Sequence, residues 1–198
     1  LCIYSEKYAS LDEVKDGDGI AIIKDGEVVD MLTREDGLSS GVILRSIKDP
    51  KTDGVFLVTS NGLCYLEEDF SIRSIKNFPY FNNYDIWVKN KETLFVTSSA
   101  GIYVVSRDDL VADKENMTYD LLDSRRGLNS ALTANSWNYA DDKGDLFLSC
   151  DKGMFIIDTD RYAVSTRSYR MNLTSVSLDN NLRRIERGNV IRVGRGVL

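Results

Sequence analysis

Carboxylates are the most frequent groups in this chain that could do chemistry, since 31 of its 198 residues are Asp or Glu. Asp141 and Asp142 are adjacent, and two carboxylates can serve as the acid and the base of glycoside hydrolysis. Adjacent side chains on a strand point to opposite faces, however, which works against their sharing a substrate. Lys143-Gly144 follows directly and indicates a turn. We therefore interpret the pair as part of a turn and expect no catalytic residues.

A cation site is the second kind of chemistry that acidic residues could support. The loop that starts at Asp49 has Asp53 at its fifth position, as in a calcium-binding loop. Lys51 stands at the third position and Ser60 at the twelfth, where such a loop needs an oxygen ligand and a bidentate Glu. We interpret this segment as a hairpin turn and expect no metal site.

Histidine and cysteine limit the remaining options. The chain has no histidine, which excludes Ser-His-Asp catalysis, Cys-His catalysis and histidine-ligated metals within these 198 residues. Cys2, Cys64 and Cys150 are odd in number and lack Cys-x-x-Cys spacing, so neither a zinc site nor a disulfide framework is indicated. We expect small buried thiols and no cofactor.

Charge and aromatic residues bear on the partners. A net charge of -6 and a pI near 4.8 predict no nucleic-acid partner. The charged segment 107–126 either contacts a partner or joins two sheets as a solvated loop. One aromatic group either stacks on a sugar ring or packs between sheets; it comprises Phe78, Tyr80, Phe81, Tyr84 and Trp87. Five arginines either form a positive patch or line solvated strands: Arg183, Arg184, Arg187, Arg192 and Arg195. These patterns leave the ligand-binding residues undefined.

A repeated pattern must position all of these residues. Each copy is an apolar strand, a few polar residues, a glycine and a second apolar strand. The glycines are Gly26, Gly62, Gly101 and Gly153, which lie 36, 39 and 52 residues apart. Propeller blades repeat about every 40 to 50 residues and contain four antiparallel strands. Helical spacing is confined to 10–14 and 107–111.

The spacing predicts an all-β fold, a β-propeller fragment of about three and a half four-stranded antiparallel blades. We place the partial propeller at 1–170, with repeats near 15–33, 38–76, 84–122 and 128–169. Within the last repeat we expect strands at 132–139 and 163–169, besides the two that flank Gly153. An incomplete ring leaves apolar faces without a neighbour, because blades bury their faces against one another. We therefore expect either self-association or further blades that complete the propeller.

Two segments of the second repeat carry a resemblance to a known family. They are 42–49, Val-Ile-Leu-Arg-Ser-Ile-Lys-Asp, and 53–65, Asp-Gly-Val-Phe-Leu-Val-Thr-Ser-Asn-Gly-Leu-Cys-Tyr. Together they resemble the two-component regulator propeller repeat. The preceding Asp36-Gly-Leu-Ser-Ser40 is similar to the link between such repeats, and Arg126-Gly-Leu-Asn-Ser130 matches it again. The third copy departs from the family pattern, with Lys91-Glu92 in place of its Asp-Gly turn.

The resemblance implies the sensor region of a hybrid histidine kinase or a diguanylate cyclase. In that family a small Ig-like sandwich follows the propeller, so we expect its first strands within 171–198, at 171–179 and 189–193. The module would lie outside the cytoplasm, in the periplasm or at the cell surface, in a membrane-anchored parent protein. Since the chain begins with Leu1, we expect an excised piece of such a protein.

Three functions stay open at this point. The resemblance favours a non-catalytic ligand-sensing module, with a carbohydrate or another small ligand, that passes a binding-induced shift to a cytoplasmic output domain. The first alternative is a protein-interaction or dimerisation platform without a small ligand. The second is a propeller enzyme that acts on polysaccharide.

Overall fold

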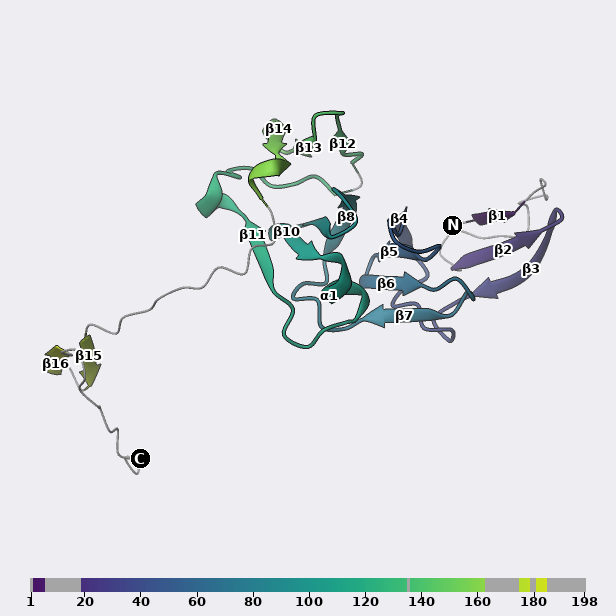
Figure 1. Ribbon diagram of the computed structural model, residues 1–198, viewed down its shortest axis with the longest axis horizontal. Coiled ribbons are helices and arrows are strands. Elements are labelled where there is room, and N and C mark those ends of the chain that lie inside the picture. Colours follow the sequence, from purple (N-terminus) through teal and green to yellow (C-terminus); the bar gives the residue numbers. More distant parts are fainter. Residues whose placement is uncertain (1, 6–18, 135, 163–174, 179–180, 185–198) are drawn as a thin grey trace, which may run out of the picture. The chain divides into compact units, whose positions relative to one another are not determined.

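A computed structural model describes residues 2–5, 19–134, 136–162, 175–178 and 181–184 (Figure 1). The chain divides into two compact units, Leu1–Ser165 and Thr166–Leu198. The described strands of the first unit form four separate sheets, and those of the second form one. We number the sheets of the first unit 1 to 4 in chain order. The fold is all-β and consists of propeller-type blades, as predicted.

Sheets 2 and 3 are complete four-stranded antiparallel blades (Figure 1). The strands of sheet 2 follow in chain order: β4 (Ile43–Lys48), β5 (Val55–Thr59), β6 (Gly62–Leu66) and β7 (Ile72–Ile75). Those of sheet 3 are β8 (Asn83–Val88), β9 (Thr93–Ser98), β10 (Gly101–Ser106) and β11 (Tyr119–Leu122). The glycines that open β6 and β10 have positive φ angles, 122° at Gly62 and 130° at Gly101, which the tight hairpins require.

Short helices lie between strands of the first unit. The helix α1 (Arg107–Val111) begins after Ser106, whose hydroxyl accepts the Asp109 N–H as an N-cap. It confirms the short helix expected at 107–111, whereas segment 10–14 lies outside the described residues. Two 3-10 turns follow, η2 (Ser124–Arg126) and η3 (Thr159–Arg161).

Sheet 1 differs from the expected antiparallel blade. It contains β1 (Cys2–Ser5), β2 (Ile20–Lys24) and β3 (Glu27–Leu32), and β1 pairs with β2 in parallel. A parallel neighbour needs a crossover connection instead of a hairpin. Fourteen positions lie between Ser5 and Ile20, which is long enough for such a connection. The apolar stretch before residue 15 is only four residues long and carries no turn signal, so the sequence predicts no strand there.

Sheet 4 also corrects the prediction. It contains β12 (Tyr139–Ala140), β13 (Asp145–Cys150) and β14 (Gly153–Asp158). The strand expected at 132–139 is wrong over most of its length: Leu132 makes one isolated bridge, and residues 136–138 have no regular structure. The strand expected at 163–169 lies outside the described residues.

Both faces of sheets 2 and 3 are buried, which explains their continuous apolar runs. In β5, Leu57 packs with residues of sheet 1, while Phe56 and Val58 pack with residues of sheet 3. In β9, Leu94 packs toward sheet 2 and Phe95 toward sheet 4. Alternate residues of one strand thus belong to different cores. A strand that is covered on both sides needs apolar residues at every position.

The second unit contains β15 (Ser175–Leu178) and β16 (Asn181–Arg184), which pair as antiparallel strands. The first lies inside the strand expected at 171–179. The second was not predicted, and 189–193 lies outside the described residues. The boundary at residue 170 and the Ig-like sandwich stay predictions.

Candidate functional site

An irregular segment of sheet 4 is the first component of the candidate site. In sheet 2, Ile43 pairs with the last residue of β5, and Ile47 pairs with the residue three positions before it. The equivalent partners of β13 are Leu132 and Tyr139. Ile43 and Ile47 are four positions apart, whereas Leu132 and Tyr139 are seven apart, so the segment that leads into β12 has three more residues than the equivalent part of sheet 2. Trp137 lies in this stretch and is 82% exposed.

A pocket of about 390 Å³ lies beside this segment. Its walls come from the first strands of sheets 2 and 3, β4 and β8, which lie side by side, and from residues 137–138. The residues with aromatic or polar side chains that matter for binding are Arg45, Asp85, Trp87, Trp137 and Asn138. Two sheets and the irregular segment before sheet 4 therefore contribute to one concave site, which is the usual form of a small-molecule site.

Arg45 connects the irregular segment to sheet 2. Its guanidinium carbon lies 4.2 Å from the ring centroid of Trp137, a cation–π contact. Its Nη2 donates a hydrogen bond of 2.6 Å to the carbonyl oxygen of Ser136. Both contacts reach residues more than 90 positions away in the sequence. They hold Trp137 with one ring face against a cation, while most of the side chain remains open to solvent.

Asp85 is the acidic group of the pocket. It accepts a hydrogen bond of 3.0 Å from the side-chain amide of Asn138, and its Oδ1 lies 3.8 Å from Nε of Arg45. That Nε is buried and has no hydrogen-bond partner in the described part of the chain. Burial raises the pKa of Asp85, although the Asn138 hydrogen bond and the Arg45 charge act in the opposite direction. Arg45 and Asp85 are thus an ion pair without a hydrogen bond between Nε and the carboxylate.

An exposed indole beside polar groups can bind a ring-shaped ligand. The face of Trp137 provides an apolar platform, and the amide of Asn138 and the carboxyl of Asp85 can orient hydroxyl groups. A sugar ring has both features, apolar C–H faces and hydroxyls at its edge. The pocket therefore has the chemistry to bind a carbohydrate unit.

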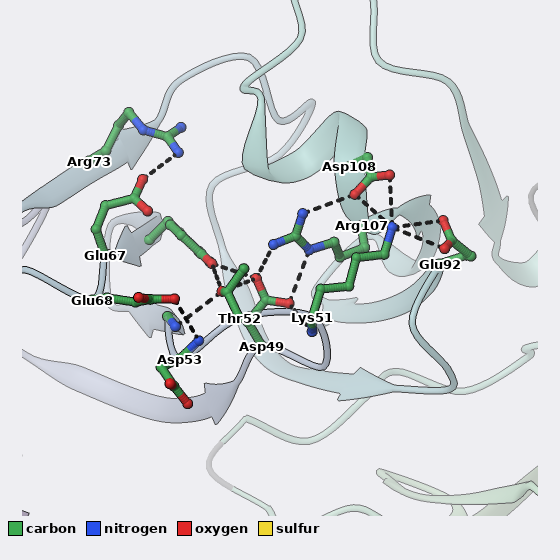
Figure 2. A network of polar contacts seen from close by, with 12 residues as sticks. Asp49, Lys51, Thr52, Asp53, Glu67, Glu68, Arg73, Glu92, Arg107 and Asp108 are labelled. Carbon is green, nitrogen blue, oxygen red and sulfur yellow. Dashed lines mark hydrogen bonds and ion pairs between the residues drawn. The ribbon is translucent and has the colours of Figure 1, made fainter.

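The loop at Asp49 has a different role, which Figure 2 shows. The Asp49 carboxylate is buried and accepts hydrogen bonds from Nε and Nη2 of Arg107, from the Tyr65 and Thr52 hydroxyls and from the Lys51 N–H. Burial alone would raise the pKa of Asp49, but these hydrogen bonds lower it overall. Its oxygens are occupied by donors of the protein itself.

This network joins sheets 2 and 3. Asp49 follows β4, whereas Arg107 begins α1 directly after β10. Lys51 adds contacts of 3.0 Å to Glu92 and 2.9 Å to Asp108, nearer the surface (Figure 2). The start of the charged segment 107–126 therefore connects sheets. Whether the rest of it contacts a partner stays a prediction.

The other residues that the sequence singled out are distributed over the sheets. Phe78 packs edge-on against Tyr103, 5.2 Å away, and Trp87 packs against Phe95 at 5.4 Å. The aromatic group thus packs mainly between sheets, and only Trp87 lines the pocket. Cys64 and Cys150 are free and buried, as expected.

The acidic pair confirms the turn interpretation. Oδ1 of Asp141 accepts the N–H groups of Lys143 and Asp145, which closes the turn between β12 and β13. In the ranges that the structure describes, no three Asp, Glu or Cys side chains are grouped in a way that could hold a metal ion.

Sequence reasoning missed Arg45, Asp85 and Asn138. A signal for two of them exists, because Arg45 and Asp85 each pair with the next-to-last residue of the following strand. They occupy equivalent places in two repeats and carry opposite charges. Asn138 carries no comparable signal.

Comparisons with known proteins bear on the fold. No family model matches the chain, and no curated protein matches it. Among solved structures, it is similar to the extracellular domain of the hybrid two-component system BT3049 from B. thetaiotaomicron, with 18% identity and a TM-score of 0.55. That match covers 78% of this chain and 20% of the other. The likeness confirms the fold.

A second solved structure is the extracellular domain of the one-component system BT4673 from B. thetaiotaomicron. Its identity is 15% and its TM-score 0.42, and the match covers 65% of this chain and 16% of the other. The chain spans about a fifth of the length of the first. The part of the chain described here has no helix long and apolar enough to cross a membrane.

Proposed function

We propose that this chain is part of a ligand-sensing module of a bacterial transmembrane signalling protein and lies outside the cytoplasm. The fold likeness to an extracellular domain and the repeat resemblance support this location. The observation that carries the proposal is the pocket in which Arg45 holds the exposed Trp137. The ligand is a carbohydrate fragment, and the module itself is non-catalytic.

The signal arises from contacts that differ between two arrangements of the sheets. Arg45 lies in sheet 2, Asp85 in sheet 3 and Trp137 in the segment directly before sheet 4, so one bound ring contacts all three parts at once. A ligand can shift a conformational equilibrium only by its differential affinity for the two states. A ligand in this pocket favours the arrangement in which the three sheets are close, and the output domain responds to that arrangement.

Binding is tested by titrating the chain with a panel of plant, fungal and host oligosaccharides. The chain has two tryptophans, so burial of Trp137 under a sugar should change the fluorescence, and a bound ligand should raise the melting temperature. We expect Trp137→Ala to weaken binding by about tenfold or more, because a lost stacking contact of about 1.4 kcal/mol corresponds to that factor.

Tyr139→Ala is the matched control, since Tyr139 is exposed as well (64%) and lies two residues away. It should leave the affinity unchanged. Equal losses in both variants would place the ligand elsewhere. A flat response across the panel would favour the alternative, a protein-interaction platform, for which the exposed apolar face of sheet 4 is the supporting observation.

A further inference from the structure

The pocket beside Trp137 contains two charged side chains, and the protein uses them in different ways. Arg45 and Asp85 are the charged residues of its described lining, and they carry opposite charges. The lining as a whole therefore has no net charge. The class of carbohydrate that the pocket accepts depends on which of the two charges a ligand can reach.

The Arg45 guanidinium is engaged by the protein itself. Its Nη1 donates a hydrogen bond of 2.8 Å to the Leu44 carbonyl oxygen, and its Nη2 donates one of 2.6 Å to the Ser136 carbonyl oxygen. Its face lies against the Trp137 ring, 4.2 Å from the ring centroid, and its Nε is buried. An anionic ligand binds arginine best through two parallel N–H groups of one edge. Here every nitrogen is buried or already donates, so Arg45 supports Trp137 and is a poor partner for a ligand anion.

The Asp85 carboxylate keeps capacity to accept hydrogen bonds. Its Oδ1 accepts the Ile86 N–H at 2.8 Å, and its Oδ2 accepts the Asn138 amide at 3.0 Å. Nε of Arg45 lies 3.8 Å from Oδ1, which is too far for a hydrogen bond. A carboxylate can accept about four hydrogen bonds, so Asp85 can accept about two more. Two neighbouring hydroxyls of a sugar ring can donate both.

We infer that the pocket selects uncharged sugars and excludes acidic ones, because the charge that a ligand meets there is the Asp85 carboxylate. The inference rests on the proposed function and makes Asp85 the specificity-determining residue. Hydroxyls of a neutral ring donate to Asp85 while the ring lies on the face of Trp137 that Arg45 leaves open. A uronate or a sulfated sugar brings a second negative charge to the same site, where like charges repel. That repulsion discriminates between the two classes.

Matched pairs of oligosaccharides test the selection. The probes are β-1,4-linked tetrasaccharides of glucose, mannose and galactose, each also in a form whose C6 hydroxyls are oxidised to carboxylates. At neutral pH, tryptophan fluorescence should show that a neutral form binds at least about tenfold more tightly than its oxidised form. Equal or tighter binding of an oxidised form would overturn the inference and leave the proposed function standing. No response to either form, or to the whole oligosaccharide panel, would contradict the proposed function itself.

Asp85→Asn tests the carboxylate directly. The change keeps the size of the side chain and removes its charge, so the preference for the neutral form should shrink to about threefold or less. Asp142→Asn is the matched control, because Asp142 is exposed in the turn between β12 and β13, outside the pocket, and its replacement changes the net charge equally. It should leave the preference unchanged. Equal changes in both variants would assign the selection to the overall charge of the chain and contradict the role of Asp85. The wild-type comparison remains decisive if Asp85→Asn does not fold.

The pH profile of binding is a second readout, which a purely structural role of Asp85 would not affect. Burial raises the pKa of Asp85, and hydroxyl donors favour its charged form, so the affinity for a neutral probe should rise as pH rises through that pKa. A neutral sugar has no titrating group, and Arg45 stays protonated throughout. The affinity of Asp85→Asn should not change with pH. A wild-type affinity that is equally independent of pH would show that the ligand does not bind the carboxylate, and the inference would fall.

Discussion

Asp49 and Asp85 are carboxylates of low exposure whose pKa values move in opposite directions. Burial acts on both and disfavours the charged form. Arg107 and Tyr65 donate directly to Asp49, so its pKa is lowered overall. The donors to Asp85 are amides, and Arg45 lies at 3.8 Å, so burial prevails and its pKa is raised. Asp49 is therefore a structural anion. The Asp85 carboxylate is not fully stabilised by its neighbours, and a ligand that donates a hydrogen bond could stabilise it.

The raised pKa of Asp85 predicts a pH effect of definite sign. Between the ordinary Asp pKa of about 3.8 and the raised value, the folded chain binds more protons than the unfolded chain, so the contribution of Asp85 to stability falls as pH rises. Asp85→Asn removes this dependence. Urea denaturation at acidic and at neutral pH should show that the free energy of unfolding depends less on pH in the variant. The variant should lose no stability at neutral pH.

The opposite result has a specific meaning. If Asp85→Asn lost stability mainly at neutral pH, the Arg45 ion pair would outweigh the effect of burial, and our account of the pocket charge would be wrong. Asp49 should show the reverse sign, because its lowered pKa adds stability that is lost as pH falls through that value.

At the scale of elements, the buried ion pair between Arg107 and Asp49 connects α1 to the turn between β4 and β5. Arg107→Met leaves the Asp49 carboxylate buried without its cation, which typically costs about 3–5 kcal/mol. The double variant Asp49→Asn with Arg107→Met should lose less than the sum of the two single changes, because no charge is left unpaired. Urea denaturation of the four proteins measures the coupling.

Lys51→Met is the control for this cycle. Lys51 joins the same two sheets through Glu92 and Asp108, but its contacts lie nearer the surface, where ion pairs contribute little. Its loss should be much smaller than that of Arg107. Equal losses would mean that the network acts through total charge, not through the buried contact.

The sequence predicts those elements whose structure is determined by local sequence signals. The strand 55–59 and the helix 107–111 match the structure, because a continuous apolar run and helical spacing are local signals. The strand predicted at 132–139 is wrong, because Trp137 and Tyr139 are typical strand residues and no local pattern marks the three extra positions. The contact between Arg45 and Trp137 could not be predicted, because only the packing of three sheets brings them together.

At the scale of the first unit, each sheet depends on its neighbours. Phe56 and Phe95 lie in cores that two sheets share, so neither core can form from one repeat alone. Repetition therefore made the sheet stack predictable from spacing, since each glycine-centred hairpin returns the chain to the same register. The pocket includes the irregular segment before β12, which departs from the repeat, so the spacing of the repeats does not predict it.

Hydrogen exchange tests this dependence directly. Sheets 2 and 3 are covered on both faces, whereas the face of sheet 4 that carries Tyr139, Met154 and Ile156 is exposed. Amides of β5 and β9 should therefore exchange at least about tenfold more slowly than those of β13, because local opening needs less energy where fewer apolar contacts break. Peptide-level mass spectrometry of the 198-residue chain resolves these strands. Equal protection of β13 and β9 would show that the sheets open as one cooperative unit, and the neighbour-by-neighbour account would fail.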